Sequence, residues 1–279
     1  MPTAHLVDAN GAQIPALGLG TFRLEGDACV EAVRTAIAAG YRHIDTAKMY
    51  ANEKEVGAGI AACGVPRDDL FVTTKVWWED IAPGDLERSA EASLKRLGLS
   101  VVDLLLIHWP NKAVPVADCI GALCEAKRRG LARHIGISNF PSAMVREAVR
   151  LASEPIVANQ VEYHPRLTQS AVLAATREAG MALTSYCPLG RGEILADPTV
   201  ASIATAHGRT PAQIVLRWHV QQPGVVAIPK SGNAERIAQN LDVFDFALAD
   251  EEMLAISGLA RPDGRVVDPA FAPEWDRTA

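Results

Sequence analysis

The chain has 279 residues, of which 49% are hydrophobic and 22% are charged, and its formal net charge at pH 7 is -6. These values are those of an ordinary globular protein, long enough for one α/β domain of barrel size, and we expect a single domain over residues 1–279. No run or stripe of basic residues offsets the acidic balance, so we expect neither a nucleic-acid partner nor binding to anionic membranes.

The five cysteines are scattered and lack the paired spacing of a zinc site. An odd number of unpaired thiols is typical of a reducing compartment, so we expect a cytoplasmic protein without a metal ion. The first residues lack the charged and then apolar pattern of a signal peptide, and no apolar stretch reaches the roughly 18 residues of a membrane helix. We therefore expect a protein that is neither exported nor membrane-spanning.

The N-terminal segment predicts a β-hairpin. Two short strand-like runs, 5–7 and 13–15, flank the sequence Asp-Ala-Asn-Gly at 8–11. An Asn-Gly pair is a strong signal for a tight hairpin turn. We expect this small unit to precede the main body of the fold.

Beyond the hairpin, short apolar runs alternate with longer segments of helical pattern. The eight runs lie at 17–20, 42–45, 71–76, 101–108, 133–138, 157–162, 182–186 and 225–229. They recur at intervals of roughly 25 to 30 residues, with one longer gap before the last, which is the repeat of strand plus helix in an eight-fold barrel. We predict a (β/α)8 TIM barrel, preceded by the hairpin and followed by a short C-terminal tail.

An open, doubly wound sheet is the alternative fold. If such a sheet bound a dinucleotide, it would usually carry a glycine fingerprint between its first strand and helix. Gly57, Gly59 and Ala62 fit the loose pattern, but they lie inside the predicted helix that follows Asn52, which we expect to be its N-cap. We therefore interpret them as helix residues and not as a nucleotide site.

Four ionisable residues fall at the C-terminal ends of predicted strands, where barrel enzymes carry their chemistry. They are Asp45, Tyr50, Lys75 and His108. A lysine in an apolar strand is costly to desolvate unless a carboxylate meets it, and Asp45 ends the neighbouring strand, so we expect a buried ion pair. Taken singly, each residue also has a structural interpretation, as a cap, a packing residue, an ion pair or a core histidine.

Together these four residues suit the reduction of a carbonyl group. A phenol has a pKa near 10, and we expect the Lys75 ammonium to lower that of Tyr50. Asp45 would hold Lys75 charged, His108 would orient the carbonyl oxygen, and Tyr50 would donate the proton.

Seven motifs follow the predicted strands in order: HIDTAKMYANE, TTKVW, LLLIHWP, GISNF, NQVEYHP, SYCPLGRG and IPKSGNAERIAQN. In order and spacing, from about Leu17 to Asn240, they resemble the aldo-keto reductase family of NADPH-dependent barrel enzymes. The chain is similar in particular to the bacterial 2,5-diketo-D-gluconate reductases. Its ending, GRVVDPAFAPEWD, is similar to that of their B-type members.

The resemblance assigns the four residues to the catalytic tetrad of the family, with Tyr50 as general acid. It implies NADPH-dependent reduction of aldehydes and ketones to alcohols, with small dicarbonyls such as 2,5-diketo-D-gluconate or methylglyoxal as substrates. One alternative is a regulatory or structural barrel that binds the cofactor without turnover. Another is a metal-dependent hydrolase built on His43, His108 and Asp45, although the His-x-His pair expected of such a site is missing.

The resemblance also implies a site for NADPH or NADP+. The residues expected there are Gly20, Thr21, Ser138, Asn139, Gln160, Tyr186, Leu189, Gly190, Lys230, Ser231, Arg236 and Asn240. Ser138, Asn139 and Gln160 match the positions that bind the nicotinamide carboxamide. Tyr186 matches the aromatic residue that stacks on the nicotinamide ring.

The preference for NADPH over NADH depends on Lys230, Ser231 and Arg236. They place two cations and a hydroxyl beside the predicted start of a helix, which suits a 2'-phosphate. A solvated basic helix start is the other interpretation of this cluster.

The substrate site is expected to have aromatic walls from Phe22, Trp77 and Trp109, beside His108. Trp78 and Trp275 are further candidates for this wall. About twenty residues follow the last helical pattern, 250–258, and so short a tail predicts a short C-terminal lid and an open site that accepts small polar dicarbonyls or aldehydes. His164 and Arg166 are candidates for binding a substrate carboxylate, and we expect a monomer.

Overall fold

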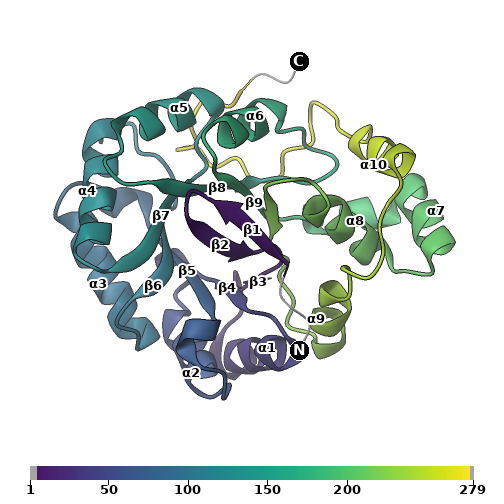
Figure 1. The fold of residues 1–279 in the computed structure, drawn as a ribbon, viewed down its shortest axis with the longest axis horizontal. Helices are drawn as coiled ribbons and strands as arrows, with labels where there is room; N and C mark the ends of the chain where they lie inside the picture. The colour runs from purple at the N-terminus through teal and green to yellow at the C-terminus, as the bar shows by residue number, and fades with distance from the viewer. Residues whose placement is uncertain (1–4, 277–279) are drawn as a thin grey trace.

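The computed structural model describes residues 5–276 and contains an eight-stranded parallel sheet at its centre (Figure 1). The strands are β3 (Leu19–Gly20), β4 (His43–Asp45), β5 (Phe71–Val76), β6 (Val102–Ile107), β7 (Ala132–Ser138), β8 (Ile156–Glu162), β9 (Ala182–Tyr186) and β10 (Val225–Ala227). They neighbour one another in chain order from β3 to β10. All eight strands predicted from the apolar runs are present, and each begins and ends within two residues of its predicted bounds.

The first and last strands meet and close the sheet. Parallel bridges join Leu17 to Ala227 and Gly20 to Lys230, and the backbone N–H of Gly18 donates to the carbonyl of Ala227 over 2.9 Å. Gly20 has no room for a side chain, because a Cβ there would lie 2.8 Å from the carbonyl oxygen of Ile228. The predicted (β/α)8 barrel is confirmed.

Helices surround the barrel on its outer face (Figure 1). They are α1 (Gly26–Ala39), α2 (Glu53–Ala61), α3 (Asp85–Leu97), α4 (Val116–Arg128), α5 (Ser142–Leu151), α6 (Ser170–Glu178), α7 (Pro198–His207), α8 (Pro211–Val220), α9 (Ala234–Leu241) and α10 (Asp250–Ser257). Since both faces of the sheet are covered, every residue of β5, β6 and β8 is buried. This explains the nearly continuous apolar sequence of β6, whereas β5 and β8 also bury polar residues, among them Lys75 and Gln160.

Local sequence signals account for the helix ends. Gly40 ends α1 with a φ of 113°, a conformation that favours glycine, and its N–H reaches the last carbonyls of the helix. At the start of α8, Thr210 and Gln213 form a capping box.

The glycine pattern in α2 serves helix packing. A Cβ at Gly57 would lie 2.2 Å from the carbonyl oxygen of Leu97 in α3, and one at Gly59 would lie 2.8 Å from the side chain of Val33 in α1. The glycine pattern therefore lies inside a helix and allows close packing, as predicted, and is not a nucleotide fingerprint.

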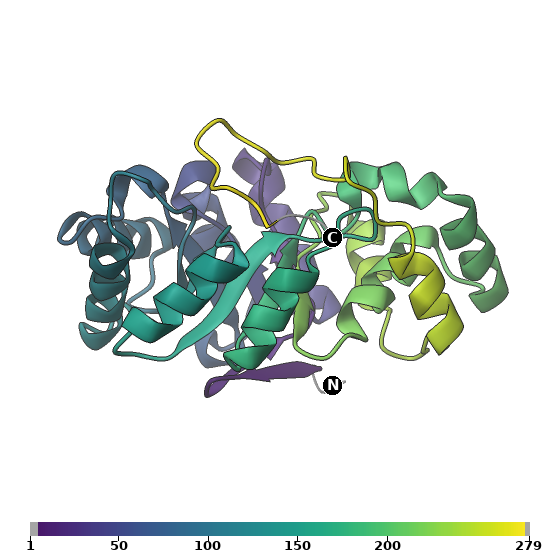
Figure 2. The ribbon, with the colours of Figure 1, turned by 90° about the horizontal axis from the view of Figure 1, so that it is seen from above.

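The hairpin and the C-terminal tail cover opposite ends of the barrel (Figure 2). The hairpin consists of β1 (Leu6–Ala9) and β2 (Ala12–Pro15), joined by Asn10 and Gly11, which both have positive φ as the turn signal predicted. Its Ile14 is fully buried in the core cluster inside the barrel. Residues 258–276 instead run across the C-terminal ends of the strands, the end that carries the predicted site. Within residues 5–276, no helix is long and apolar enough to cross a membrane.

Candidate active site

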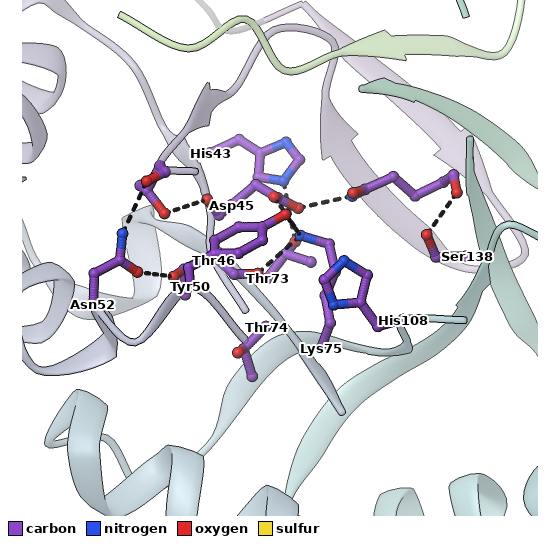
Figure 3. Close-up of polar contacts among 12 residues, drawn as sticks. His43, Asp45, Thr46, Tyr50, Asn52, Thr73, Thr74, Lys75, His108 and Ser138 are labelled. Carbon is purple, nitrogen blue, oxygen red and sulfur yellow. Dashed lines mark hydrogen bonds and ion pairs between the residues drawn. The ribbon is translucent and has the colours of Figure 1, made fainter. Parts of the chain in front are cut away.

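The four ionisable residues meet at the C-terminal end of the barrel (Figure 3). Asp45 ends β4, Lys75 is on β5, and His108 directly follows β6. Tyr50 ends a short 3-10 helix, Lys48–Tyr50, in the loop after β4. Three adjacent strands and one loop therefore bring them together.

The ammonium of Lys75 is fully buried and uses all three of its N–H groups. It donates to Asp45 Oδ1 over 2.5 Å, to the carbonyl of Thr46 over 2.9 Å and to Tyr50 Oη over 3.2 Å. Burial lowers the pKa of Lys75, and the charge of Asp45 opposes this shift. The expected buried ion pair is present.

The carboxylate of Asp45 is satisfied on both sides. Its second oxygen accepts from Gln160 Nε2 over 2.7 Å, so a residue of β8 reaches across the barrel to the catalytic pair. The backbone carbonyl of Asp45 accepts from the hydroxyl of Thr21 over 3.0 Å. Each oxygen of the carboxylate therefore has a hydrogen-bonding partner, and Asp45 is held in the position in which it pairs with Lys75.

The phenol of Tyr50 is positioned as a hydrogen-bond donor. Its oxygen accepts from Lys75, and within residues 5–276 its own proton has no acceptor, although the ring lines a cavity. Burial raises the pKa of Tyr50 well above 10, and the negative charge of Asp45 adds to this shift. The prediction that the pKa of Tyr50 is lowered is therefore wrong for this structure, because burial and then the charge of Asp45 raise it. Tyr50 is a phenol at neutral pH, the form that a general acid requires.

The imidazole of His108 lies beside Tyr50 without a hydrogen bond to any described residue. The two ring centres are 5.7 Å apart, edge to face, and Nδ1 is buried without a partner. Burial, followed by the charge of Lys75, lowers the pKa of His108 well below 6.5. A neutral imidazole with an unused N–H suits an uncharged carbonyl oxygen.

These groups open into a cavity of about 470 Å³. It is lined by Gly20, Thr21, Phe22, Arg23, Asp45, Met49, Tyr50, His108, Trp109, Asn139, Gln160, Tyr186, Cys187, Pro188, Arg191, Ile228, Lys230 and Val267. Its size is that of a small-molecule site, with a mainly apolar wall and a few polar groups.

The expected aromatic wall is present in part. Phe22 and Trp109 line the cavity, whereas Trp77 packs behind His108 with a ring-centre distance of 5.2 Å. Trp78 and Trp275 are not in the lining and pack against the tail residue Phe271 and against Trp109, respectively.

The C-terminal tail adds to the wall of the site. Phe271 lies among three tryptophans, 5.7 Å from the ring of Trp77, 4.9 Å from Trp78 and 5.5 Å from Trp109. Val267 of the same segment lines the cavity itself. The sequence did not indicate either contact, since the tail has no periodic pattern.

Half of the expected cofactor residues line the cavity and half lie around it. Those in the lining are Gly20, Thr21, Asn139, Gln160, Tyr186 and Lys230, and those outside it are Ser138, Leu189, Gly190, Ser231, Arg236 and Asn240.

The polar residues at the C-terminal end of β7 are hydrogen-bonded to one another and to neighbouring strands. Asn139 accepts from the Tyr186 hydroxyl over 2.8 Å and donates to the carbonyl of His108 and to Ser138 Oγ. Ser138 itself donates to the carbonyl of Gln160 over 2.7 Å. Tyr186, which lines the cavity, is thus held in place through its hydroxyl.

The cations near α9 have no partner of their own. Within residues 5–276, the side chains of Lys230 and Arg236 make no ion pair and no hydrogen bond. Asn233 caps α9 by accepting from the backbone N–H of Arg236 over 2.9 Å, and Ser231 accepts from the N–H of Asn233 over 3.1 Å. Two unpaired cations at the start of a helix fit the phosphate groups of a dinucleotide.

Several cavity residues were not predicted: Arg23, Met49, Cys187, Pro188, Arg191, Ile228 and Val267. They lie in loops without a periodic pattern. Arg23, Cys187 and Arg191 have positive φ, which their residue types do not signal.

Three predictions for polar residues are wrong. His164 is buried and bonded to Glu162, and Arg166 pairs with Glu193, so neither faces the cavity. Asn52 occupies the N-cap position of α2, but its side chain does not cap the helix. It instead donates to the carbonyls of Thr21 and Leu24, thereby fixing the loop after β3.

The residues of the hydrolase alternative do not gather around a metal position. The ring nitrogens of His43 lie 3.1 Å from Thr73 Oγ1 and 3.4 Å from the carbonyl of Pro15. Among residues 5–276, no three His, Cys, Asp or Glu side chains are arranged to hold a metal ion.

A closed (β/α)8 barrel with a Tyr, Lys, Asp and His set at its C-terminal end is typical of oxidoreductases with a barrel fold. Residues 16–261 match the model of the Aldo/keto reductase family, and the chain belongs to this family.

Known relatives extend over nearly the whole chain. It is 43% identical over 266 residues to a methylglyoxal reductase DkgB from Escherichia coli O157:H7, which covers 94% of this chain and 99% of that protein. A crystal structure whose protein carries the provisional name 2,5-diketo-D-gluconic acid reductase B matches with a TM-score of 0.97 and 48% identity, over 99% of this chain and 98% of that one. A Bombyx mori aldo-keto reductase in complex with NADP matches with a TM-score of 0.89 and 37% identity, over 97% and 96%.

Proposed function

We propose that this protein reduces small aldehydes and ketones to alcohols with NADPH, with Tyr50 as the general acid. The observation that carries the proposal is the Tyr50 hydroxyl, which accepts from Lys75, donates to no residue among 5–276 and lies at a cavity that it shares with an unpartnered His108. Such an arrangement donates hydrogen bonds to an oxygen that gains negative charge.

Each residue has a definite part in the reaction. Tyr50 and His108 bind the carbonyl oxygen, and Tyr50 transfers its proton to that oxygen as the alcohol forms. An alkoxide is a stronger base than a phenolate, so this transfer is favourable even with the raised pKa of Tyr50. Lys75 then stabilises the phenolate left behind, and Asp45 holds Lys75 in place.

We assign the cofactor site to the second half of the barrel. Bound NADPH supplies the hydride that reaches the carbonyl carbon, so that carbonyl, NADPH and one proton become alcohol and NADP+. Tyr186 provides a flat surface for the nicotinamide ring beside Tyr50, and Gln160 and Asn139 lie next to it. Lys230, Ser231 and Arg236 are assigned to the 2'-phosphate.

Small dicarbonyls are the substrates that the cavity suits best. Its wall is mainly apolar, with Phe22, Met49 and Trp109 around the catalytic groups, and its volume is about 470 Å³. The names of two relatives, a methylglyoxal reductase and a 2,5-diketo-D-gluconic acid reductase, support the same class.

The test is NADPH oxidation by the purified protein with methylglyoxal, 2,5-diketo-D-gluconate and an aromatic aldehyde, beside Tyr50→Phe. The variant loses the proton donor but keeps the ring, so kcat should fall by roughly a hundred- to ten-thousand-fold while NADPH binding is retained. Appreciable turnover by Tyr50→Phe would count against Tyr50 as the acid. Tight NADPH binding without turnover by the wild type would favour a regulatory or structural barrel.

A further inference from the structure

The tail that crosses the barrel mouth is fixed by two carboxylates. Near its start, Glu162, the last residue of β8, accepts from the backbone N–H groups of Val266 over 2.7 Å and Val267 over 2.8 Å. At its far end, Asp276 accepts from the backbone N–H and the hydroxyl of Ser142 over 2.8 and 2.7 Å. Asp276 thereby caps α5, whose N-cap residue, Pro141, has no capping side chain.

The anchored segment is in close contact with the barrel. A Cβ at Gly264 would lie 1.8 Å from the carbonyl oxygen of Arg166, so the tail backbone rests directly on the loop after β8. The next residues bring Val267 to the cavity and Phe271 into the tryptophan cluster. The position of this part of the wall therefore depends on the two anchors.

The same Glu162 carboxylate also holds a residue on the cofactor side. Its Oε1 lies 3.0 Å from His164 Nε2, and the ring of His164 lies under Gly190, where a Cβ would be 3.6 Å from the ring atoms. The other ring nitrogen, Nδ1, is buried without a partner among the described residues. The ring that supports the Leu189–Gly190 turn is therefore fixed from the Glu162 side alone.

We propose that Glu162 is a positioning residue that couples the cofactor turn to the tail wall of the substrate site. The proposal rests on the proposed function, because the Leu189–Gly190 turn contacts a cofactor only if NADPH binds there. The carboxylate is fully buried, so its orientation is set by its three hydrogen-bonding partners: His164 and the N–H of Val266 at Oε1, and the N–H of Val267 at Oε2. When bound NADPH orders the turn, the turn fixes the ring of His164. The ring then fixes the Glu162 carboxylate, and the carboxylate fixes the tail. By reciprocity, an ordered tail strengthens NADPH binding.

The rate of limited trypsin digestion measures how firmly the tail is bound to the barrel. Between residues 258 and 276 the basic residues are Arg261, which precedes a proline and is resistant to trypsin, and Arg265. The bond after Arg265 adjoins the Glu162 anchor, and its cleavage gives a product lacking residues 266–279, which intact mass identifies.

In the wild type, saturating NADPH should slow cleavage after Arg265 by about fivefold or more, the lower end of usual coupling effects. In Glu162→Gln, which keeps the side-chain volume but replaces one acceptor oxygen with a donor, cleavage should be faster and NADPH should no longer slow it. Asp276→Asn is the matched control: it loosens the far anchor, so cleavage is faster, but NADPH should still protect. NADPH is added at saturation for each variant, as measured by protein fluorescence.

A second variant covers the case in which Glu162→Gln does not fold. His164→Leu leaves both tail hydrogen bonds to Glu162 in place and removes the His164–Glu162 hydrogen bond, through which the carboxylate is linked to the turn at Gly190. It should abolish protection by NADPH while cleavage without NADPH changes less than twofold. A merely structural role of Glu162 would lower thermal stability but leave the ratio of cleavage rates with and without NADPH unchanged.

Equal protection by NADPH in the wild type and His164→Leu would overturn the coupling, as would unchanged cleavage of a wild type that binds NADPH. A wild type that fails to bind NADPH in the fluorescence titration overturns the proposed function, and the coupling with it. The separate binding measurement distinguishes this failure from the others.

Discussion

The two sides of the barrel mouth differ in how far their polar groups are satisfied. At the ends of β4, β5 and β6, all three N–H groups of Lys75 and both carboxylate oxygens of Asp45 have a hydrogen-bonding partner within the chain. Around α9, Lys230 and Arg236 have no partner among the described residues. The first side is preorganised by the chain itself, whereas the second contains charges that are suited to a ligand.

Lys75→Met tests the satisfied side and should have the largest effect. It leaves the buried Asp45 carboxylate without its counter-charge, so the free energy of unfolding should fall by about 3–5 kcal/mol. Urea unfolding measures the loss. In the double variant Lys75→Met with Asp45→Leu, most of this stability should return, because no buried charge remains. A loss below about 1 kcal/mol in the single variant would contradict the dependence of the two residues on each other.

His219 tests the scaffold of the barrel next to the second side of the mouth, the side around α9. It is fully buried on α8, with its ring nitrogens 2.8 Å from the carbonyl of Val215 and 3.1 Å from that of Tyr163. Burial lowers its pKa to about 4, although both carbonyls favour the charged form. Between pH 6.5 and 4 the unfolded chain therefore binds a proton that the folded chain does not, and stability falls as the pH falls through this window.

The contribution of His219 to this loss is about 3 kcal/mol between pH 7 and pH 4. Urea unfolding at a series of pH values measures it. His219→Gln cannot titrate, so its stability should change less with pH than that of the wild type. Identical pH dependence in the two proteins would show that His219 is charged or accessible in the folded state.

Arg236→Ala tests the unsatisfied side. If Arg236 binds the 2'-phosphate, its removal should raise the Kd for NADPH by roughly ten- to hundredfold, the strength of a charge-assisted hydrogen bond, and leave the Kd for NADH unchanged. Folding stability should change little, since the guanidinium has no partner to lose. Fluorescence titration with both cofactors gives the two constants, and equal losses for both would exclude the 2'-phosphate role.

Phe271→Ala tests the tail wall and should have the smallest effect. Loss of one aromatic contact is worth about 1 kcal/mol, so KM for an aromatic aldehyde should rise by about threefold to tenfold with kcat nearly unchanged. Phe244→Ala is the control, because Phe244 stacks on His5 beside the hairpin, at the opposite end of the barrel. A similar rise in KM for Phe244→Ala would mean that the effect is not local.

The strands and the meeting of Asp45, Tyr50, Lys75 and His108 at one end of the barrel could be predicted from the sequence, because each has a local signal. Buried parallel strands are short apolar runs, and residues such as Asp45 and Lys75 are conspicuous where those runs end. The single domain over 1–279, the monomeric state and the cytoplasmic location stay predictions.

The errors concern quantities that depend on the folded surroundings. The pKa of Tyr50 is raised by burial and then by the charge of Asp45. Asn52 was expected to cap a helix, but distant carbonyls bind its side chain. The tail contacts of Glu162 join residues more than one hundred positions apart, and no periodicity in the sequence indicates them.

The ammonium of Lys75, whose three N–H groups are all hydrogen-bonded, also determines how a proton can reach Tyr50. The hydrogen-bonding partners of Lys75 and Asp45 on the protein side, Thr46 and Gln160, are themselves buried, so this side of Tyr50 has no contact with bulk water. If Tyr50 acts as the proposed general acid, the proton that it gives up must be replaced through the same opening that admits the carbonyl compound. Reprotonation of Tyr50 then requires an empty cavity, so each catalytic cycle of the proposed reaction would include an interval in which the mouth is open to solvent.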